Sequence, residues 1–497
     1  MFNQGSDNKN NNQVNPLILR IMVQDKQKVL ILGLGRYATG SGVSAALYFA
    51  KRGDDVIVTD ALPLKEVKDN VAQLKKYKNV KFHLGGLNLK DIDWADIIAK
   101  NPGVRRNDPM YLRAKKLGKL IVNDITIFFE KCPCLTIGIT GTRGKSTTTA
   151  WIGDMLKRSG KKAYIGGNIT VSPLTFLSKL KKSDIAVIEL SSWLLETCGE
   201  VGISPNIAVW TNVMRDHLNT YDGMEDYAEA KAQIMRHQKP SDIFIPNLDD
   251  ELVSAYVSEA PSIIKGFSEK KKSKSVAWVS KDKLMLQDCK KLVEILDIKD
   301  IGLAGAHNIK NALAAVVSAK VAGATLTGIR ESLKKFTGMP YRQEIIAVKN
   351  GITFVNDTTS TTPDAATAAI ERFAKNGQAL HWICGGAEKD LPYEDLMTFV
   401  ARRTRAHRST GEGGSQSSHV NVQVLDGTAF KRFTTAMKKQ GIKFTKNTSL
   451  KSALDNCLKI AKKGDVVLLS PACSSFGMFK NEFDRGDQFN DLVRNLA

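Results

Sequence analysis

A strand, a glycine-containing loop and a helix follow one another in the second quarter of this chain, and this order constrains the fold more than any other feature. The apolar run Leu135–Ile139 predicts the strand, and Gly141 and Gly144 allow the turn. Lys145 and Ser146 open the helix and add a mobile cation and a hydroxyl that suits Mg²⁺. Because loop N–H groups and the helix dipole converge here, the segment predicts a phosphate site for ATP or GTP.

The loop departs from the standard phosphate-loop pattern, because Ile139 stands where the first glycine is usual. The turn therefore has to depend on Gly141 and Gly144. An ordinary helix entry rich in Thr and Gly is the alternative, and the order of strand, Gly-Lys-Ser and helix favours the phosphate site. The residues assigned to the nucleotide here are Gly141, Thr142, Arg143, Gly144, Lys145, Ser146 and Thr147.

Length and periodicity predict three α/β domains. A chain of 497 residues is too long for one core, since domains usually hold ~100–200 residues. Strands alternate with helices throughout, which favours mainly parallel sheets. The expected domains are a Rossmann-like domain over 25–131, a central phosphate-loop ATPase domain over 132–336 and a second Rossmann-like domain over 337–497. Residues 1–24 are rich in Asn, Gln and Lys and are expected to be disordered, and the Ser- and Gly-rich stretch 403–418 reads as a surface insertion.

The first βαβ unit has a glycine-rich turn after the strand Val29–Leu32, and its second strand ends at Asp60. Gly33 and Gly35 begin a dinucleotide fingerprint, but Ala38 occupies the third glycine position. The NAD signal is therefore weak. The pyrophosphate or ribose of a mononucleotide could use the same loop and Asp60.

Charge and cysteine content narrow the function classes. Lys and Arg total 72 against 51 Asp and Glu, a net charge of +21, but these residues are spread along the chain rather than interleaved with aromatics. This spread indicates a basic surface that attracts anionic small substrates, not a nucleic-acid site. Seven scattered cysteines, no signal peptide and no apolar run near ~18–20 residues predict a cytoplasmic protein without membrane spans. Cys132 and Cys134 read as an incidental pair in a linker.

Further polar residues follow predicted strands of the central domain. Glu189 ends one strand, and Asp216 and His217 follow another, so a metal or phosphate role is favoured over a purely structural one. Lys231 lies in a predicted helix, where local sequence alone indicates a solvated surface lysine. A second predicted helix carries His307, Asn308 and Asn311 at its start, and these asparagines either cap the helix or contact an adenine edge.

Together these motifs resemble the ATP-dependent muramyl ligase (Mur ligase) family, from about Lys28 to the C-terminus. The resemblance is carried by Thr140–Thr147, Gly167-Asn168, Glu189–Ser192, Asn212–His217, Tyr227–Lys231, His307-Asn308 with Asn311, Pro340–Arg342, Asn356-Asp357 and Leu469–Ser475. It implies a ligase that joins glutamate to the alanine carboxylate of UDP-N-acetylmuramoyl-L-alanine through an acyl phosphate, in peptidoglycan precursor synthesis. ATP and two Mg²⁺ would be the cofactors, and the protein is expected to be a monomer that binds neither nucleic acid nor membrane.

The resemblance also assigns roles to residues of this sequence. Lys145 would bind the β- and γ-phosphates, Ser146 and Glu189 one Mg²⁺, and His217 a second Mg²⁺. The family's matching lysine is carbamylated, which would make Lys231 an anionic ligand near the metals. The remaining assignments are Asn308, Arg342 and Asp357 to ATP; Gly33, Gly35, Asp60 and Asn168 to the UDP-sugar; and Thr361, Lys389, Ser475 and Phe476 to glutamate.

Three departures from the family pattern leave alternatives open. Relatives commonly read Asp-Ser-Lys-Ala-Thr where this chain has Asp357–Thr361 without the lysine, and Glu482 precedes Phe483 where Phe often comes first. Arg143 occupies a position that is often Asn. D-glutamate is the expected substrate and L-glutamate the alternative. A related ligase such as a folylpolyglutamate synthase, or a nucleotide-binding protein without catalysis, are the other possibilities.

Overall fold

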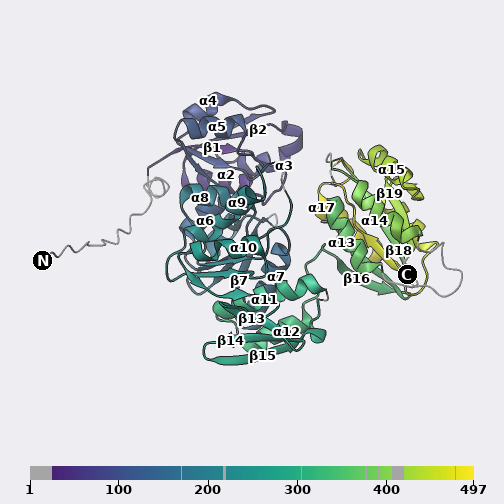
Figure 1. Ribbon diagram of the computed structural model, residues 1–497. Helices are drawn as coiled ribbons and strands as arrows, with labels where there is room; N and C mark the ends of the chain where they lie inside the picture. Colours follow the sequence, from purple (N-terminus) through teal and green to yellow (C-terminus); the bar gives the residue numbers. More distant parts are fainter. Residues whose placement is uncertain are drawn as a thin grey trace. The chain divides into compact units, whose positions relative to one another are not determined.

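The computed structural model describes residues 25–168, 171–216, 220–303, 305–374, 378–388, 391–405, 419–475 and 477–496. Two compact units make up the chain, one ending at Phe336 and one beginning at Thr337. Both are built from strands sandwiched between helices (Figure 1). The expected tail 1–24, most of the expected insertion 403–418, and His217, Lys389 and Phe476 lie outside the described residues.

The first unit begins with a five-stranded parallel sheet of order β3-β2-β1-β4-β5. Its strands are β1 Lys28–Leu32, β2 Asp55–Asp60, β3 Val80–Leu84, β4 Ile97–Lys100 and β5 Leu120–Val122. Its helices are α2 Ser41–Arg52, α3 Leu64–Leu74, α4 Leu89–Trp94, α5 Pro109–Lys116 and α6 Asp124–Lys131. Helices α2 and α3 pack on one face, and α4 and α5 on the other. The strand order reverses between β1 and β4, so the loops after these two strands form the usual ligand crevice of such a sheet.

A second parallel sheet in this unit places β6 between β9 and β8, in the order β11-β10-β9-β6-β8-β7. The strands are β6 Leu135–Thr140, β7 Ala163–Gly167, β8 Ile185–Glu189, β9 Ile207–Trp210, β10 Ile243–Pro246 and β11 Ile263–Ile264. Helices α7 Lys145–Arg158, α11 Ala306–Val321 and α12 Leu326–Lys335 cover one face, and α6, α8 Ser192–Val201, α9 Met224–Arg236 and α10 Glu251–Ala255 the other. The loops after β6, β8 and β9 therefore share one edge of the sheet.

A small sheet that the sequence did not indicate packs beside the second one. It consists of β12 Gly266–Phe267, β13 Ser275–Ser280, β14 Lys283–Asp288 and β15 Lys291–Asp297. The β13–β14 hairpin turns through Lys281 and Asp282, both with positive φ, 48° and 58°. Two-residue turns of this kind are normally signalled by Asn-Gly or Asp-Gly, and the absence of such a pair explains why this hairpin was not expected from the sequence.

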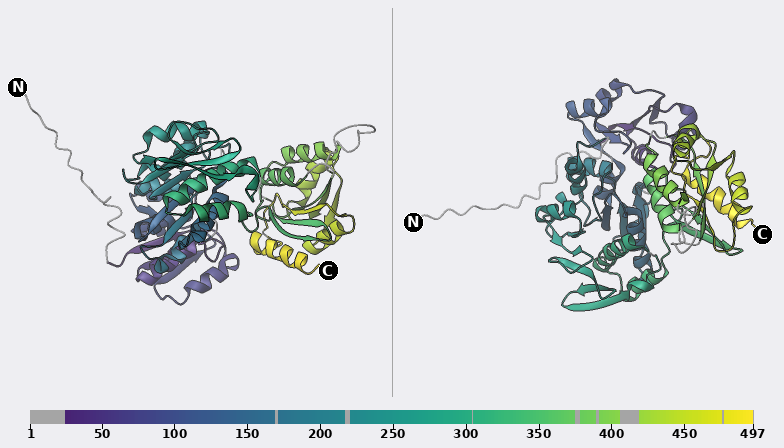
Figure 2. Two further views of the ribbon diagram at one scale, coloured as in Figure 1. Left: turned by 90° about the horizontal axis from the view of Figure 1, so that it is seen from below. Right: turned by 45° about the vertical axis from the view of Figure 1, so that its right-hand side comes forward.

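The second unit holds a six-stranded sheet of order β16-β17-β21-β18-β19-β20, parallel except for the edge strand β16. Its strands are β16 Glu344–Lys349, β17 Ile352–Asn356, β18 Ala379–Gly385, β19 His419–Leu425, β20 Phe444–Asn447 and β21 Val466–Leu469. Helices α13 Pro363–Phe373, α14 Glu394–Arg405 and α15 Phe430–Lys439 cover one face. Helices α16 Leu450–Leu458 and α17 Glu482–Arg494 cover the other, where α17 appears as the yellow helix in Figure 2.

These sheets confirm the α/β class with mainly parallel strands. The seven cysteines, all within the described ranges, are free thiols. Within the described part of the chain, no helix is both long and apolar enough to cross a membrane.

Candidate active site

Two glycines shape the loop between β6 and α7. Gly144 precedes α7 with φ of 81°, and no described side chain caps this helix end. A Cβ atom on Gly144 would lie 2.2 Å from Asn311 Oδ1, and one on Gly141 would lie 2.0 Å from Thr211 Oγ1. Only glycine fits at either position. Ile139, at the position where the first glycine is usual, lies fully buried within β6. The turn that follows therefore depends on Gly141 and Gly144.

The loop backbone is held by residues that follow β9. Asn212 Oδ1 accepts hydrogen bonds from the backbone N–H of Thr142 at 3.1 Å and of Arg143 at 2.9 Å. Thr211 Oγ1 donates to the Arg143 carbonyl at 2.8 Å. These contacts hold the loop through the backbone of Thr142 and Arg143.

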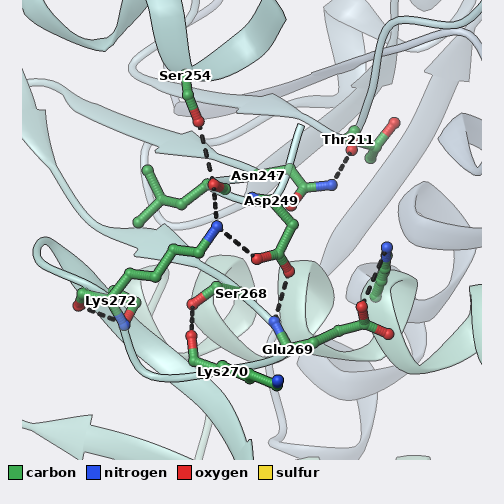
Figure 3. Close-up of polar contacts among 11 residues, drawn as sticks. Thr211, Asn247, Asp249, Ser254, Ser268, Glu269, Lys270 and Lys272 are labelled. Atoms are coloured by element: carbon green, nitrogen blue, oxygen red, sulfur yellow. Dashed lines mark hydrogen bonds and ion pairs between the residues drawn. The ribbon is translucent and has the colours of Figure 1, made fainter. Parts of the chain in front are cut away.

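Contacts behind the loop extend to the small sheet (Figure 3). Asn247 Nδ2 donates to the Thr211 carbonyl at 2.7 Å. Two residues on, Asp249 accepts from the Glu269 N–H at 2.6 Å and pairs with Lys272 Nζ at 2.8 Å. The turn between β12 and β13 is thereby tied to the segment that supports the phosphate loop.

Lys145 and Lys231 meet at one carbonyl group. Lys145 Nζ donates to the carbonyl oxygens of Gly141 and Thr142, each at 3.0 Å, and Lys231 Nζ donates to Gly141 O, also at 3.0 Å. Lys231 Nζ also lies 4.4 Å from the ring centroid of Tyr227. Two amines from different helices thus face the same loop.

The expectation of a solvated Lys231 was wrong, because its side chain is only 1% exposed. Burial, together with the charge of Lys145, holds the pKa of Lys231 well below its usual range, and Asp216 and Glu189 oppose this shift. The local sequence does not indicate this burial, because the residues around Lys231 on α9 are mostly alanines. Alanine suits any helix position, and here those alanines are buried with it.

Glu189 offers an unused carboxylate oxygen at the end of β8. Its side chain is 2% exposed, and Oε1 accepts from Asn168 Nδ2 at 3.0 Å. Its other oxygen, Oε2, is buried without a hydrogen-bond partner among the described residues. Buried carboxylate oxygens normally have a hydrogen-bond partner, and a hard cation bound at this oxygen would take the place of one.

The donor set fits Mg²⁺ better than a metal held by a protein cage. The described residues contain no group of three or more His, Cys, Asp or Glu side chains that could hold a metal. Mg²⁺ commonly takes one or two carboxylates, with water and substrate phosphate completing its shell. Glu189 and Ser146, at the first turn of α7, suit that pattern. The second metal site stays a prediction, since His217 is not described.

The two asparagines of α11 do not cap that helix. Gly305 occupies the N-cap position, while Asn311 Nδ2 donates to Asn308 Oδ1 at 3.1 Å. Both side chains are buried, and Asn311 lies against Gly144. Neither asparagine is therefore the N-cap residue of α11, and contact with the adenine stays a prediction.

The glycine turn after β1 is shaped by Asp60. Asp60 Oδ2 accepts from the N–H groups of Leu34 at 2.8 Å and Gly35 at 2.9 Å, and Oδ1 accepts from Leu62 N–H at 2.8 Å. Gly33 and Gly35 both have positive φ, 90° and 76°. In this structure the carboxylate of Asp60 orders the loop.

A pocket of ≈ 180 Å³ joins this turn to the central sheet. It is lined by Leu34, Gly35, Tyr37, Gly40, Ser41, Asn101, Pro102, Asp124, Gly167, Asn168, Ser172 and Leu194. Asn168 is shared, since it lines the pocket and also donates to Glu189. A ligand seated in the pocket can therefore present one end to the carboxylate beside the phosphate loop.

In the second unit, polar side chains gather after β17 and β21. Asp357 accepts from Ser470 Oγ at 2.8 Å and from the Gln343 N–H at 3.0 Å. Burial raises the pKa of Asp357 to about 7 against the opposing hydrogen bonds and the charge of Arg342. Ser475 is 1% exposed, and its hydroxyl has no partner among the described residues.

Arg485 is a site residue that the sequence did not reveal. Its side chain is fully buried, and its guanidinium donates to Thr358 Oγ1 at 3.0 Å and to Thr358 O at 2.9 Å. Thr358 directly follows Asp357, so Arg485 braces the turn that carries this acid. A buried arginine has no local signature, because its partner lies in a distant part of the chain.

The raised pKa of Asp357 predicts a pH-dependent effect of Asp357→Asn. A carboxyl group whose pKa rises on folding stabilises the protein below its unfolded value of 3.8, and this contribution is lost by about pH 7. We expect Asp357→Asn to raise the Tm of the ligand-free chain by roughly 2–8 °C at pH 8 and to have little effect at pH 4. Asp455→Asn, at a half-exposed position on α16, is the control. A variant less stable than the wild type at pH 8 would contradict the burial argument.

Comparison with known proteins covers nearly the whole chain. Family models match in chain order: Mur ligase MurD-like, N-terminal domain (27–123), Mur ligase middle domain (139–319) and Mur ligase, glutamate ligase domain (341–473). UDP-N-acetylmuramoylalanine--D-glutamate ligase of Roseiflexus sp. (strain RS-1) is 34% identical over 95% of this chain and 99% of that protein. The protein of the same name from Acetivibrio thermocellus is 33% identical over 95% and 97%.

Solved structures agree on the fold. MurF from Acinetobacter baumannii superposes with a TM-score of 0.57 at 16% identity, covering 94% of this chain and 93% of that one. UDP-N-acetylmuramate-alanine ligase MurC from Thermotoga maritima gives 0.55 at 20%, covering 94% and 99%. Because three family models match most of the chain in order and relatives of 33–34% identity cover 95% of it, the chain belongs to the Mur ligase family.

Proposed function

We propose that this protein is an ATP-dependent ligase that adds D-glutamate to the alanine carboxylate of UDP-N-acetylmuramoyl-L-alanine. Relatives that carry this reaction in their names match 95% of the chain. The structural observation that carries the proposal is the hydrogen bond between Asn168 and Glu189. Because Asn168 also lines the pocket, a substrate held there would have its carboxylate end beside the phosphate loop.

The chemistry requires activation of a carboxylate, which is a poor acyl donor. Transfer of the γ-phosphoryl group of ATP to the carboxylate gives an acyl phosphate and ADP. The glutamate amine attacks the acyl carbon, phosphate leaves, and a proton is lost as the amide forms. The uncapped start of α7 and the ammonium of Lys145 would hold the β- and γ-phosphates and neutralise charge on the moving group.

Mg²⁺ would be held by Ser146, Glu189, His217 and modified Lys231, and when bound it would neutralise negative charge on the phosphates. The carboxylate oxygen Oε2 of Glu189, which has no hydrogen-bond partner among the described residues, supports one such site.

Lys231 would react as the neutral amine: its nitrogen attacks CO₂, and a proton is released as the carbamate forms. A lowered pKa favours the neutral amine, and Lys145 would stabilise the resulting anion.

The resemblance to the family assigns further residues to the substrates. Asn308, Arg342 and Asp357 are assigned to ATP. Thr361, Lys389, Ser475 and Phe476 are assigned to glutamate, and the unpaired, buried hydroxyl of Ser475 suits a hydrogen bond to that substrate. We also propose that the protein acts in the cytoplasm, where its substrate ATP is available and where its seven free cysteines would stay reduced. The expectation of a monomer stays a prediction.

A folylpolyglutamate synthase is the nearest alternative enzyme. The N-terminal Rossmann-like sheet, matched by the MurD-like N-terminal model over residues 27–123, favours a UDP-sugar substrate instead. A nucleotide-binding protein without catalysis is disfavoured by the convergence of Lys145 and Lys231 on one loop carbonyl.

Phosphate release with each glutamate enantiomer tests the proposal. With ATP, Mg²⁺ and UDP-N-acetylmuramoyl-L-alanine, we expect release with D-glutamate and at least ~100-fold less with L-glutamate, since one pocket must reject a misdirected carboxylate. UDP-N-acetylmuramate, which lacks the alanine, is the matched control and should give no release. Activity with a folate and L-glutamate, but not with the UDP-sugar, would establish the alternative.

A further inference from the structure

The loop after β4 connects the pocket to three elements of the central domain. Its first residues, Asn101 and Pro102, line the pocket. Arg105 follows; its guanidinium lies 4.1 Å from the ring centroid of Trp193 and donates to Thr220 Oγ1. The loop therefore lines the pocket at one end and contacts segments distant in the sequence at the other.

Arg106, the next residue, makes the stronger contacts. Its NH1 donates to Asp226 Oδ1 at 3.0 Å, and its NH2 donates to Asp226 Oδ2 and to the Thr220 carbonyl, the latter at 3.3 Å. The guanidinium also lies 5.1 Å from the ring centroid of Tyr221. Paired N–H groups on one carboxylate fix both distance and orientation, which lysine cannot reproduce.

The segments that Arg105 and Arg106 contact also carry the residues proposed to bind metal and to form the carbamate. Trp193 is on α8, which begins three residues after Glu189. Asp226 is in the first turn of α9, the helix of Lys231. Thr220 and Tyr221 follow the segment that contains Asp216 and His217. One loop thus contacts all three segments that bring charge to the phosphate loop.

We propose that Arg105 and Arg106 are positioning residues that couple binding of the UDP-sugar to binding of Mg²⁺-nucleotide. A ligand that orders the Asn101 end of the loop would also fix its arginine end, and with it the start of α9. By linkage, each ligand then raises the affinity for the other by the same factor. The proposal rests on the proposed function and adds to it a route between the two substrates.

The contribution of this ion pair to stability is expected to be small. The side chains of Arg106 and Asp226 are half-buried, at 32% and 30% exposed, so solvent still screens the attraction between their charges. Arg236, at the other end of α9, is a matched control. It pairs with Glu229 at 2.6 Å and Glu259 at 2.8 Å and is 29% exposed, and among the described residues it forms no hydrogen bond or ion pair with the loop after β4.

The test is to measure the coupling directly in full-length protein. Affinity for Mg²⁺ with a non-hydrolysable ATP analogue is determined by calorimetry, with and without saturating UDP-N-acetylmuramoyl-L-alanine. In the wild type we expect the UDP-sugar to tighten nucleotide binding by about tenfold, within the usual range of such couplings. Arg106→Gln should reduce this factor to about one and lower kcat about tenfold, with the Tm nearly unchanged.

Companion variants separate coupling from general damage. Asp226→Asn should lose the coupling as Arg106→Gln does, and the double variant should lose no more than either, because both remove one interaction. Arg106→Lys should restore only part of it, and Arg236→Gln should keep the wild-type factor. Full coupling in Arg106→Gln, or equal loss in Arg236→Gln, would overturn the proposal. Failure of the proposed function would appear separately, as absence of UDP-sugar-dependent phosphate release in the wild type.

Discussion

Lys145→Ala should abolish ATP-dependent phosphate release while leaving the fold intact. The ammonium of Lys145 lies over the loop, bonded to the carbonyls of Gly141 and Thr142 at 3.0 Å each. Lys231 still contacts Gly141 when Lys145 is removed, so the loop keeps a cross-link to α9. The charge that would neutralise the γ-phosphoryl group is lost, and we expect a decrease in kcat of about 10³-fold or more.

Phosphate release and thermal unfolding, measured on the same preparation, check this expectation. Lys157→Ala, in the last turn of the same helix α7, is the control and should retain both activity and Tm. Turnover near that of the wild type in Lys145→Ala would refute the assignment of the phosphate loop.

Lys231→Ala should also lose most activity, and short carboxylates should restore part of it. The lysine is buried beside Lys145 and contacts the loop at Gly141. An ammonium there would repel Mg²⁺, whereas a carbamate supplies the oxygen ligands that hard cations prefer. We expect activity to fall about 10²-fold or more, because a charged metal ligand is lost. Acetate or formate, which can enter the vacated space, should recover a measurable fraction.

Two further variants show whether the carboxylate itself matters. Lys231→Arg should be inactive and should not be rescued, since a guanidinium stays protonated and does not form the carbamate. Lys145→Ala, where an ammonium rather than an anion is missing, should not respond to acetate. Full activity of Lys231→Arg would exclude the carbamate, and equal rescue of Lys145→Ala would show that acetate acts elsewhere.

The sequence by itself determined the α/β class with mainly parallel sheets and the order of strand, glycine-containing loop and helix at β6 and α7. Apolar runs bounded by turn residues are short-range patterns. They predicted strands at Val29–Leu32 and Leu135–Ile139, and the structure has β1 at Lys28–Leu32 and β6 at Leu135–Thr140. The order of strand, Gly-Lys-Ser and helix located the start of α7. Each of these features depends on neighbours along the chain, which is why one sequence suffices to find them.

The tertiary structure alone decided which polar residues are buried and what they face. Lys231 looks solvated in its alanine-rich helix, and only the packing of α9 against the loop after β6 buries it. The small sheet escaped notice because Lys281 and Asp282 form a turn that usually requires glycine. Arg106 and Arg485 owe their roles to partners 120 and 127 residues away. Burial of a charged side chain depends on such distant partners, and the local periodicity of the sequence does not indicate them.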